Sequence, residues 1–205
     1  MTSFQERPFY RDELSRENAQ QTGEELRLAA DFLNFIESQD GLIESGKVTF
    51  AMIRPLVGPD ANLQRLPDAI AADTIEGMIT NLGVMAKFSF IFNEDTISEL
   101  YDGGPRENML QQTPIDPEAY SSRWPEFVTF MSSAPTTALI LFSEDGDAIE
   151  KWRAHLGYWN VDANRNESTI RGLLAVNKYN NLVHGSDSPE AVRREIGIIK
   201  KLISR

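Results

Sequence analysis

The chain has 205 residues, of which 41% are hydrophobic, so it can bury a core of ordinary size and is not disordered throughout. It carries 31 acidic against 20 basic residues, and this net charge of −11 argues against a nucleic-acid-binding surface over the whole chain. The lack of cysteine excludes disulfides and thiolate chemistry, and two histidines, His155 and His184, are too few for an all-histidine metal site.

Membrane segments are not expected either. No apolar run approaches the ~20 residues that a transmembrane helix needs. The first residues lack the apolar core of a secretory signal. The sequence therefore predicts a cytoplasmic protein without a membrane partner.

The charge is unevenly distributed along the chain. Residues 146–205 hold ten Lys and Arg against seven Asp and Glu, whereas residues 1–145 hold ten against 24. A chance fluctuation in the number of charged surface residues explains such a difference, and so does an anion-binding site in the last third of an acidic chain. The composition alone leaves both interpretations open.

The first 46 residues are expected to form a helical extension. Between Glu24 and Glu37, apolar residues recur at the spacing of an amphipathic helix, whose apolar side would pack on the main domain or on a neighbouring subunit. Two glycines then mark a turn. We therefore assign residues 1–46 to an extension and residues 47–205 to the main domain.

In the main domain, four apolar stretches are predicted to be strands, at residues 48–55, 84–92, 137–142 and 173–179. Helices are predicted at residues 66–82, 94–101, 124–132, about 145–156 and about 188–202. Residues 102–123 contain two adjacent glycines and three prolines, which indicates a long loop or insertion. This order predicts an α+β fold in which helices cover a ferredoxin-like antiparallel sheet.

Particular residues mark the ends of these helices. Asn93 and Ser188 are expected to be N-caps, and Ser188 is followed by a proline and an acidic residue, as is typical of a helix start. Gly83 and Gly157 are expected to end the helices that precede them.

His184 is the most informative single residue. It precedes Gly185 and the cap of the last helix, where exposed backbone amides favour anions. A neutral imidazole is a competent nucleophile towards phosphorus. Glu195, in the same helix, is placed to orient the ring. A lone histidine, however, is also commonly a hydrogen-bonded structural residue, and spacing alone does not decide between the two roles.

The residues around His184 form a longer pattern. It comprises Asn181, His184, Gly185, Ser186, Asp187, Ser188, Glu195, Ile196 and Gly197. This pattern closely resembles the active-site segment of the nucleoside diphosphate kinases, in which N-[hydrophobic]₂-H-G-S-D-S precedes E-I-G. Upstream, the T-I-R-G of residues 169–172 and the R-x-x-L-G-x-x-N of residues 153–160 are similar to family segments. The resemblance covers about residues 47–200.

The resemblance implies an enzyme that transfers the terminal phosphate of a nucleoside triphosphate, bound with Mg²⁺, to a nucleoside diphosphate. His184 would be the nucleophile that carries the phosphate, with Glu195 and Ser186 as its catalytic neighbours. Nucleotide and phosphate contacts would come from Arg54, Tyr101, Arg153, Arg171 and Asn181. The family also implies a homo-oligomer. From the sequence itself we expect no metal site built from side chains and no nucleic-acid partner. His155 lacks this context and is expected to be a surface residue.

Three positions depart from the family pattern. Arg54 stands where the family has a lysine, and a planar guanidinium does not place its charge as a compact ammonium does. Trp159 stands where the family usually has a threonine at the phosphate. The aromatic residue that stacks on the base does not align; Trp124 is the nearest candidate, with core packing as an equal alternative.

These departures leave a second function open. A catalytically impaired homologue that serves as a nucleotide-binding or interaction module would also fit Arg54 and Trp159. The retained histidine, arginines and glutamate favour the enzyme. A nucleic-acid-binding role is weaker than both, because no alternation of aromatic and basic residues accompanies the positive segment.

Overall fold

The computed structural model describes residues 8–55, 75–102, 117–161, 164–166, 168–175 and 181–204. Four strands form one antiparallel sheet in the order β2-β3-β1-β4: β1 is Val48–Ile53, β2 Gly83–Phe90, β3 Thr136–Phe142 and β4 Val183–Gly185. Every residue of β1 is buried, as expected for a central strand with helices on both faces. The sheet with its helices confirms the predicted α+β, ferredoxin-like class.

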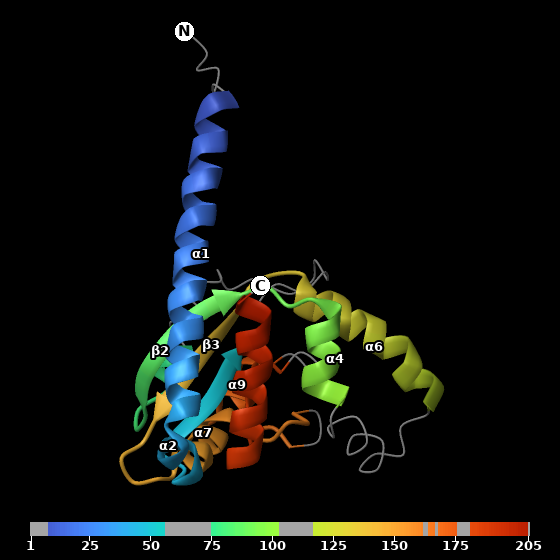
Figure 1. The fold of residues 1–205 in the computed structure, drawn as a ribbon. Coiled ribbons are helices and arrows are strands. Elements are labelled where there is room, and N and C mark those ends of the chain that lie inside the picture. The colour runs from blue at the N-terminus through green and yellow to red at the C-terminus, as the bar shows by residue number, and fades with distance from the viewer. Residues whose placement is uncertain are drawn as a thin grey trace, which may run out of the picture.

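One face of the sheet carries the larger core. It is covered by α1 (Pro8–Ser38), α2 (Asp40–Glu44), α4 (Glu94–Asp102), α6 (Pro117–Ser132) and α9 (Pro189–Ile203). In Figure 1, α1 and α9 lie side by side over this face, and the N-terminal half of α1 extends away from the sheet. The buried side chains Leu33 and Ile36 belong to the same core as Phe50 and Met52 of β1. The predicted extension therefore packs on the main domain.

The opposite face is covered by α7 (Ala148–Leu156) and α8 (Ile170–Leu174). Trp152 of α7 is fully buried there, against apolar residues of β1, β3 and β4. Gly157 ends α7, as predicted, with a φ of +78° that suits glycine. A Cβ at Gly157 would also collide with the side chain of Thr169, so this position needs glycine for two reasons.

Two predicted N-caps are confirmed. The side chain of Asn93 accepts a hydrogen bond of 2.9 Å from the N–H of Thr96 at the start of α4. The hydroxyl of Ser188 accepts one of 3.1 Å from the N–H of Ala191 in α9. The amides at this helix start also hold the pKa of Glu190 below its usual value.

The predicted fourth strand, residues 173–179, is wrong. Leu173 and Leu174 end the short helix α8, whose cap Thr169 accepts a hydrogen bond from the N–H of Gly172; residues 176–180 lie outside the described part. The strand that completes the sheet contains His184 itself. A short apolar run does not distinguish a strand from a buried helical turn, and only the pairing with β1 makes residues 183–185 a strand.

Two further boundaries are corrected. The helix predicted over residues 66–82 is described only from residue 75 and ends at residue 77, so Gly83 begins β2 instead of ending that helix. Of the insertion predicted over residues 102–123, residues 103–116 lie outside the described part, whereas residues 117–123 belong to α6. Pro117 is the first residue of α6, a position where proline is favoured. The prediction from the sequence places this proline in the loop.

The described helices include none that is both long and apolar enough to cross a membrane.

Candidate active site

Strand β4 places the His184 side chain on the face of the sheet covered by α9. Met52 of β1 is its partner in the ladder, and side chains alternate between the two faces of a strand. Val183 is therefore buried on the α7 side, and a Cβ at Gly185 would collide with the ring of Trp152. The indole Nε1 of Trp152 donates to the His184 carbonyl at 3.1 Å, so α7 fixes the backbone beneath the histidine.

A tight turn precedes the histidine. Leu182 has a φ of +66°, a left-handed conformation that costs a leucine roughly 1–3 kcal/mol and is often found at functional sites. The N–H of Val183 donates to the Asn181 carbonyl at 2.8 Å across this turn. The N–H of Arg54 donates to the Leu182 carbonyl, also at 2.8 Å. This contact brings the residue after β1 beside Asn181.

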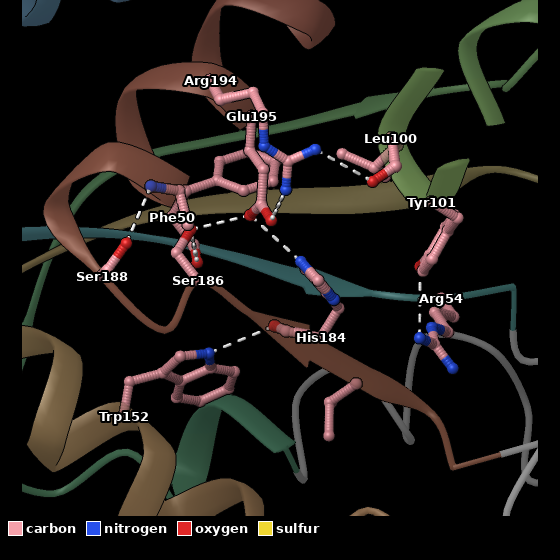
Figure 2. A network of polar contacts seen from close by, with 12 residues as sticks. Phe50, Arg54, Leu100, Tyr101, Trp152, His184, Ser186, Ser188, Arg194 and Glu195 are labelled. Carbon is pink, nitrogen blue, oxygen red and sulfur yellow. Dashed lines mark hydrogen bonds and ion pairs between the residues drawn. The ribbon is translucent and has the colours of Figure 1, made fainter. Parts of the chain in front are cut away.

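Glu195 holds one side of the His184 ring (Figure 2). Its Oε2 lies 3.0 Å from His184 Nε2 and accepts a hydrogen bond of 2.7 Å from the Ser186 hydroxyl. Its Oε1 accepts from the Arg194 guanidinium at 3.3 Å. The Glu195 side chain is only 4% exposed and that of His184 17%. The predicted catalytic residues His184, Glu195 and Ser186 thus form one hydrogen-bonded cluster.

The charge state of Glu195 follows from this cluster. Burial on its own would raise the pKa of Glu195, but the charge and hydrogen bond of His184, the Ser186 hydroxyl and the Arg194 charge outweigh burial and lower it. An ionised Glu195 accepts the Nε2–H of the imidazole and so favours the tautomer whose Nδ1 has a free lone pair. Within the described residues, no hydrogen bond to Nδ1 is found.

The residues near the other side of the ring are aromatic and cationic. Tyr101 at the end of α4 packs edge-on against His184, with 5.9 Å between the ring centres. Its hydroxyl accepts from Arg54 at 3.1 Å, and Arg54 also donates to Asn181 Oδ1 at 2.7 Å. The Arg54 guanidinium lies 5.6 Å from the centres of the Tyr101 and Phe127 rings. Arg54 therefore contacts two other predicted nucleotide contacts, Tyr101 and Asn181.

Arg171 adds a second cation beside this group. Its guanidinium donates to the carbonyls of Gly157 at 3.0 Å and Val183 at 2.9 Å. Its Nε is buried and has no hydrogen-bond partner among the described residues. Burial, followed by the charges of Arg54 and Arg153, lowers the pKa of Arg171 to about 9. Arg153 itself is exposed. Arg54, Arg153 and Arg171 thus lie close enough together for their charges to act on one another.

The two tryptophans singled out in the sequence differ in their surroundings. Trp124 packs on Phe127, with 5.8 Å between ring centres, and lies against the larger core. This contact supports core packing for Trp124. The carbonyl of Trp159 accepts from the Asn181 side chain at 3.4 Å, so the backbone of residue 159 reaches the candidate site.

Three residues of this site were missed in the sequence. Trp152 supports the His184 backbone, Phe127 lies against Arg54, and Arg194 holds Glu195. The helical spacing of Trp152 indicates a buried position but not its contact with the histidine strand. The sequence does not distinguish Arg194 from its neighbour Arg193, because both are arginines on the same helix. Only the fold shows that Arg194 contacts Glu195 and that Arg193 contacts Glu44.

The chain is similar to known proteins in sequence and in fold. Residues 116–201 match the family model described as nucleoside diphosphate kinase. The nucleoside diphosphate kinase of Corynebacterium diphtheriae is 45% identical over 73 residues, which are 36% of this chain and 52% of that protein. That of Geobacter sp. (strain M21) is 46% identical over 71 residues, 35% of this chain and 50% of that protein. The chain thus spans about half the length of the curated relatives it matches.

The structural comparison covers more of the chain. The nucleoside diphosphate kinase of Aquifex aeolicus superposes with a TM-score of 0.53 at 26% identity, over 75% of this chain and 94% of that one. The enzyme of Encephalitozoon cuniculi gives a TM-score of 0.52 at 27% identity, over 74% of this chain and 87% of that one. The similarity therefore extends beyond the matched sequence segment to the sheet and its helices.

Proposed function

Because this chain is related to the nucleoside diphosphate kinases in sequence and in fold, we propose that it transfers the terminal phosphate of a nucleoside triphosphate to a nucleoside diphosphate through a phosphohistidine on His184. One observation carries the proposal. Glu195 binds Nε2 of His184 at 3.0 Å and leaves Nδ1 as the nitrogen with a free lone pair, while Arg54 and Arg171 contact Tyr101 and Val183 beside the ring.

The reaction then proceeds in two balanced steps. Nδ1 of His184 attacks the terminal phosphorus, the bond from that phosphorus to the bridging oxygen breaks, and the nucleoside diphosphate leaves with the bonding electrons. Glu195 retains the proton on Nε2 and stabilises the positive charge that the ring gains. In the second step, a terminal oxygen of the acceptor diphosphate attacks the phosphorus, and the imidazole leaves as the neutral ring.

The arginines supply the electrostatic part of this scheme. Phosphoryl transfer depends mainly on positioning and charge neutralisation. The pKa of Arg171 is already lowered, first by burial and then by the charges of Arg54 and Arg153. A bound phosphate group would relieve that repulsion and would be held by Arg171 and Arg153. Mg²⁺ enters this scheme with the nucleotide phosphates, as part of the substrate. Over the described residues, no group of three His, Asp or Glu side chains is arranged to hold a metal ion.

Arg54 favours one alternative function. Its guanidinium is engaged by Asn181 and Tyr101, which are themselves proposed nucleotide contacts. If a nucleotide does not displace these contacts, the chain would bind nucleotide without transferring phosphate. This catalytically impaired nucleotide-binding module is the second candidate, and labelling distinguishes it from the enzyme.

The experiment compares the unaltered chain with His184→Asn and His155→Asn. His155 is a matched control, because it lies on α7 and its Nε2 is 2.7 Å from Asn81 Oδ1, away from Glu195. With γ-labelled ATP and GDP, the unaltered chain and His155→Asn are expected to form labelled protein and labelled GTP, and His184→Asn neither. Nucleotide binding without any label in the unaltered chain would favour the binding module, and labelling of His184→Asn would refute the mechanism.

We also propose that the chain forms a homo-oligomer. Support comes from large apolar side chains exposed on neighbouring elements, Leu28 and Phe35 on α1 and Val84 and Met85 on the edge strand β2. Light scattering during size-exclusion chromatography tests this proposal, and a monomer at all concentrations would contradict it.

A further inference from the structure

Arg194 connects two elements that lie on different sides of the His184 ring. Its NH2 group donates to Glu195 Oε1 at 3.3 Å, and its NH1 group donates to the carbonyl of Leu100 at 3.2 Å (Figure 2). Glu195 belongs to α9, and Leu100 belongs to the last turn of α4. The Arg194 side chain is 36% exposed, so these two hydrogen bonds, and not burial, hold it between the two helices.

The contact with Glu195 fixes the orientation of the carboxylate. Oε2 already accepts from His184 and Ser186, and Arg194 occupies Oε1. A carboxylate whose two oxygens both have donors has less freedom to rotate than one with donors on a single oxygen. The direction in which Glu195 accepts from the imidazole therefore depends on Arg194.

The contact with Leu100 holds the end of α4, which lies on the Tyr101 side of the His184 ring. The last carbonyls of a helix have no partner within the helix, and a cation at this end is favourable. Leu100 precedes Tyr101, whose ring packs on His184 and whose hydroxyl accepts from Arg54. By binding the Leu100 carbonyl, Arg194 holds the end of α4 that carries Tyr101.

We infer that Arg194 is a positioning residue for the proposed phosphoryl transfer, which holds Glu195 and the end of α4 together so that the His184 ring keeps its orientation between them. The inference rests on the proposed function, since it concerns the same reaction. Arg194 acts through Glu195 and Leu100 and makes no contact with the reacting phosphate in this scheme.

Two effects of replacing Arg194 distinguish a positioning role from a role in stabilising the fold. A small misplacement of a reacting group lowers turnover strongly, whereas nucleotide binding through the arginines is retained. Loss of a cation beside Glu195 also favours the charged form of the imidazole, so the acid limb of the pH–rate profile moves to higher pH. Among the described residues, the charged or titratable groups around the ring are Glu195 and Arg194 from α9, Tyr101 from α4, Arg54 after β1 and Arg171 from α8.

The test uses Arg194→Met, Arg194→Lys and the control Arg193→Met. Arg193 is the neighbouring arginine on α9, and it pairs with Glu44 at 2.7 Å on the exposed surface. Methionine keeps an unbranched apolar stem but removes the charge and the donors. Lysine keeps the charge, but one ammonium does not reproduce the two-armed contact of a guanidinium. Thermal unfolding of each variant shows whether it is folded.

Turnover with ATP and GDP is measured for each protein across the pH range. For Arg194→Met we expect kcat to fall roughly tenfold to a hundredfold, KM to change little and the acid limb to move to higher pH. Arg194→Lys should restore the position of the acid limb and only part of kcat, and Arg193→Met should behave as the unaltered chain. If Arg194→Met does not fold, the reduced kcat and unchanged acid limb of Arg194→Lys are the test.

Three results would overturn the inference: equal kcat in Arg194→Met and Arg193→Met, an unchanged acid limb in a folded Arg194→Met, or full turnover in Arg194→Lys. If the unaltered chain itself transfers no phosphate, the proposed function fails, and this outcome is distinct from a failure of the inference alone.

Discussion

The two sides of the His184 ring are built differently. Towards Nε2, the single carboxylate of Glu195 accepts hydrogen bonds from His184, Ser186 and Arg194, so that opposite charges and donors are matched. Towards the other side, Arg54 and Arg171 make hydrogen bonds to an amide, a phenol and backbone carbonyls, and their charges repel each other. On the first side a carboxylate is matched to its donors, whereas the groups that accept these hydrogen bonds from the two arginines on the second side are neutral.

This difference separates two tasks. The Glu195 side orients a nucleophile, which requires a fixed geometry before the substrate arrives. On the arginine side, the charges of Arg54 and Arg153 act on Arg171, and a bound phosphate group would relieve their repulsion. This favours binding of an anion. Changes on the first side should therefore lower turnover, and changes on the second should lower binding.

The largest effect is expected on the Glu195 side, from Glu195→Gln. All three groups that face this carboxylate donate to it, so the NH2 group of glutamine would either meet a donor or make Nε2 of His184 an acceptor, which moves the ring proton to Nδ1. We expect turnover to fall roughly a hundredfold with little change in nucleotide affinity. The control is Glu190→Gln, also on α9 but in its first turn. Equal turnover in both variants would remove Glu195 from the mechanism.

On the arginine side, nucleotide binding should depend on pH. The pKa of Arg171 is lowered to about 9, and the guanidinium needs its proton to hold a phosphate, so binding weakens as pH rises above that value. The dissociation constant of ADP, measured by calorimetry, should rise about tenfold per pH unit there. Arg171→Met should bind more weakly at neutral pH and lose this dependence. A dependence that persists in Arg171→Met would assign it to another group.

A smaller effect is expected from Ser186→Ala. The change removes the 2.7 Å hydrogen bond to Glu195 but leaves those from His184 and Arg194. The loss of one hydrogen bond to a charged group corresponds to about 1.5 kcal/mol, or roughly a tenfold lower turnover. Steady-state kinetics of Ser186→Ala measures it, with Ser204→Ala as the control, since the Ser204 hydroxyl donates to the backbone carbonyl of Lys200. A loss as large as that of Glu195→Gln would make Ser186 an independent catalytic group.

The smallest effect concerns stability in acid. The folded chain holds the pKa of Glu195 below its ordinary value of 4.5, so the stabilisation from ionised Glu195 is fully present above 4.5 and is lost as pH falls through the lower folded value. Urea unfolding from neutral pH to below 4.5 should therefore show a steeper loss of stability in the unaltered chain than in Glu195→Gln. Parallel curves would contradict the lowered pKa.

The sequence predicted the Glu195 side better than the arginine side. His184, Ser186 and Glu195 lie within one short segment, where the cap at Ser188 fixes the start of α9 and therefore the direction of Glu195. The arginine side is assembled from residues far apart in the chain. Arg54 meets Asn181 only because β1 pairs with β4, and β4 was predicted at the wrong residues.

The fold shows the same limit. Strands β1 and β3 were found because their apolar residues are contiguous, whereas β4 has three residues and exists through its pairing with β1. The helix α1 begins at Pro8, well before the predicted Glu24, because the prediction rested on the apolar residues of the second half, which pack in the core. Patterns that depend on burial identify elements that are buried along their own length, and miss those defined by distant partners.

The position of the phosphate on the chain tests the central claim most directly. The unaltered chain is incubated with ATP, and the phosphorylated protein is mapped by peptide digestion and by phosphorus and nitrogen NMR. We predict one phosphate, stable in base and lost in acid, on Nδ1 of His184, and its transfer to GDP when GDP is added. A phosphate on Nε2, on another residue, or one that GDP does not accept would contradict the account.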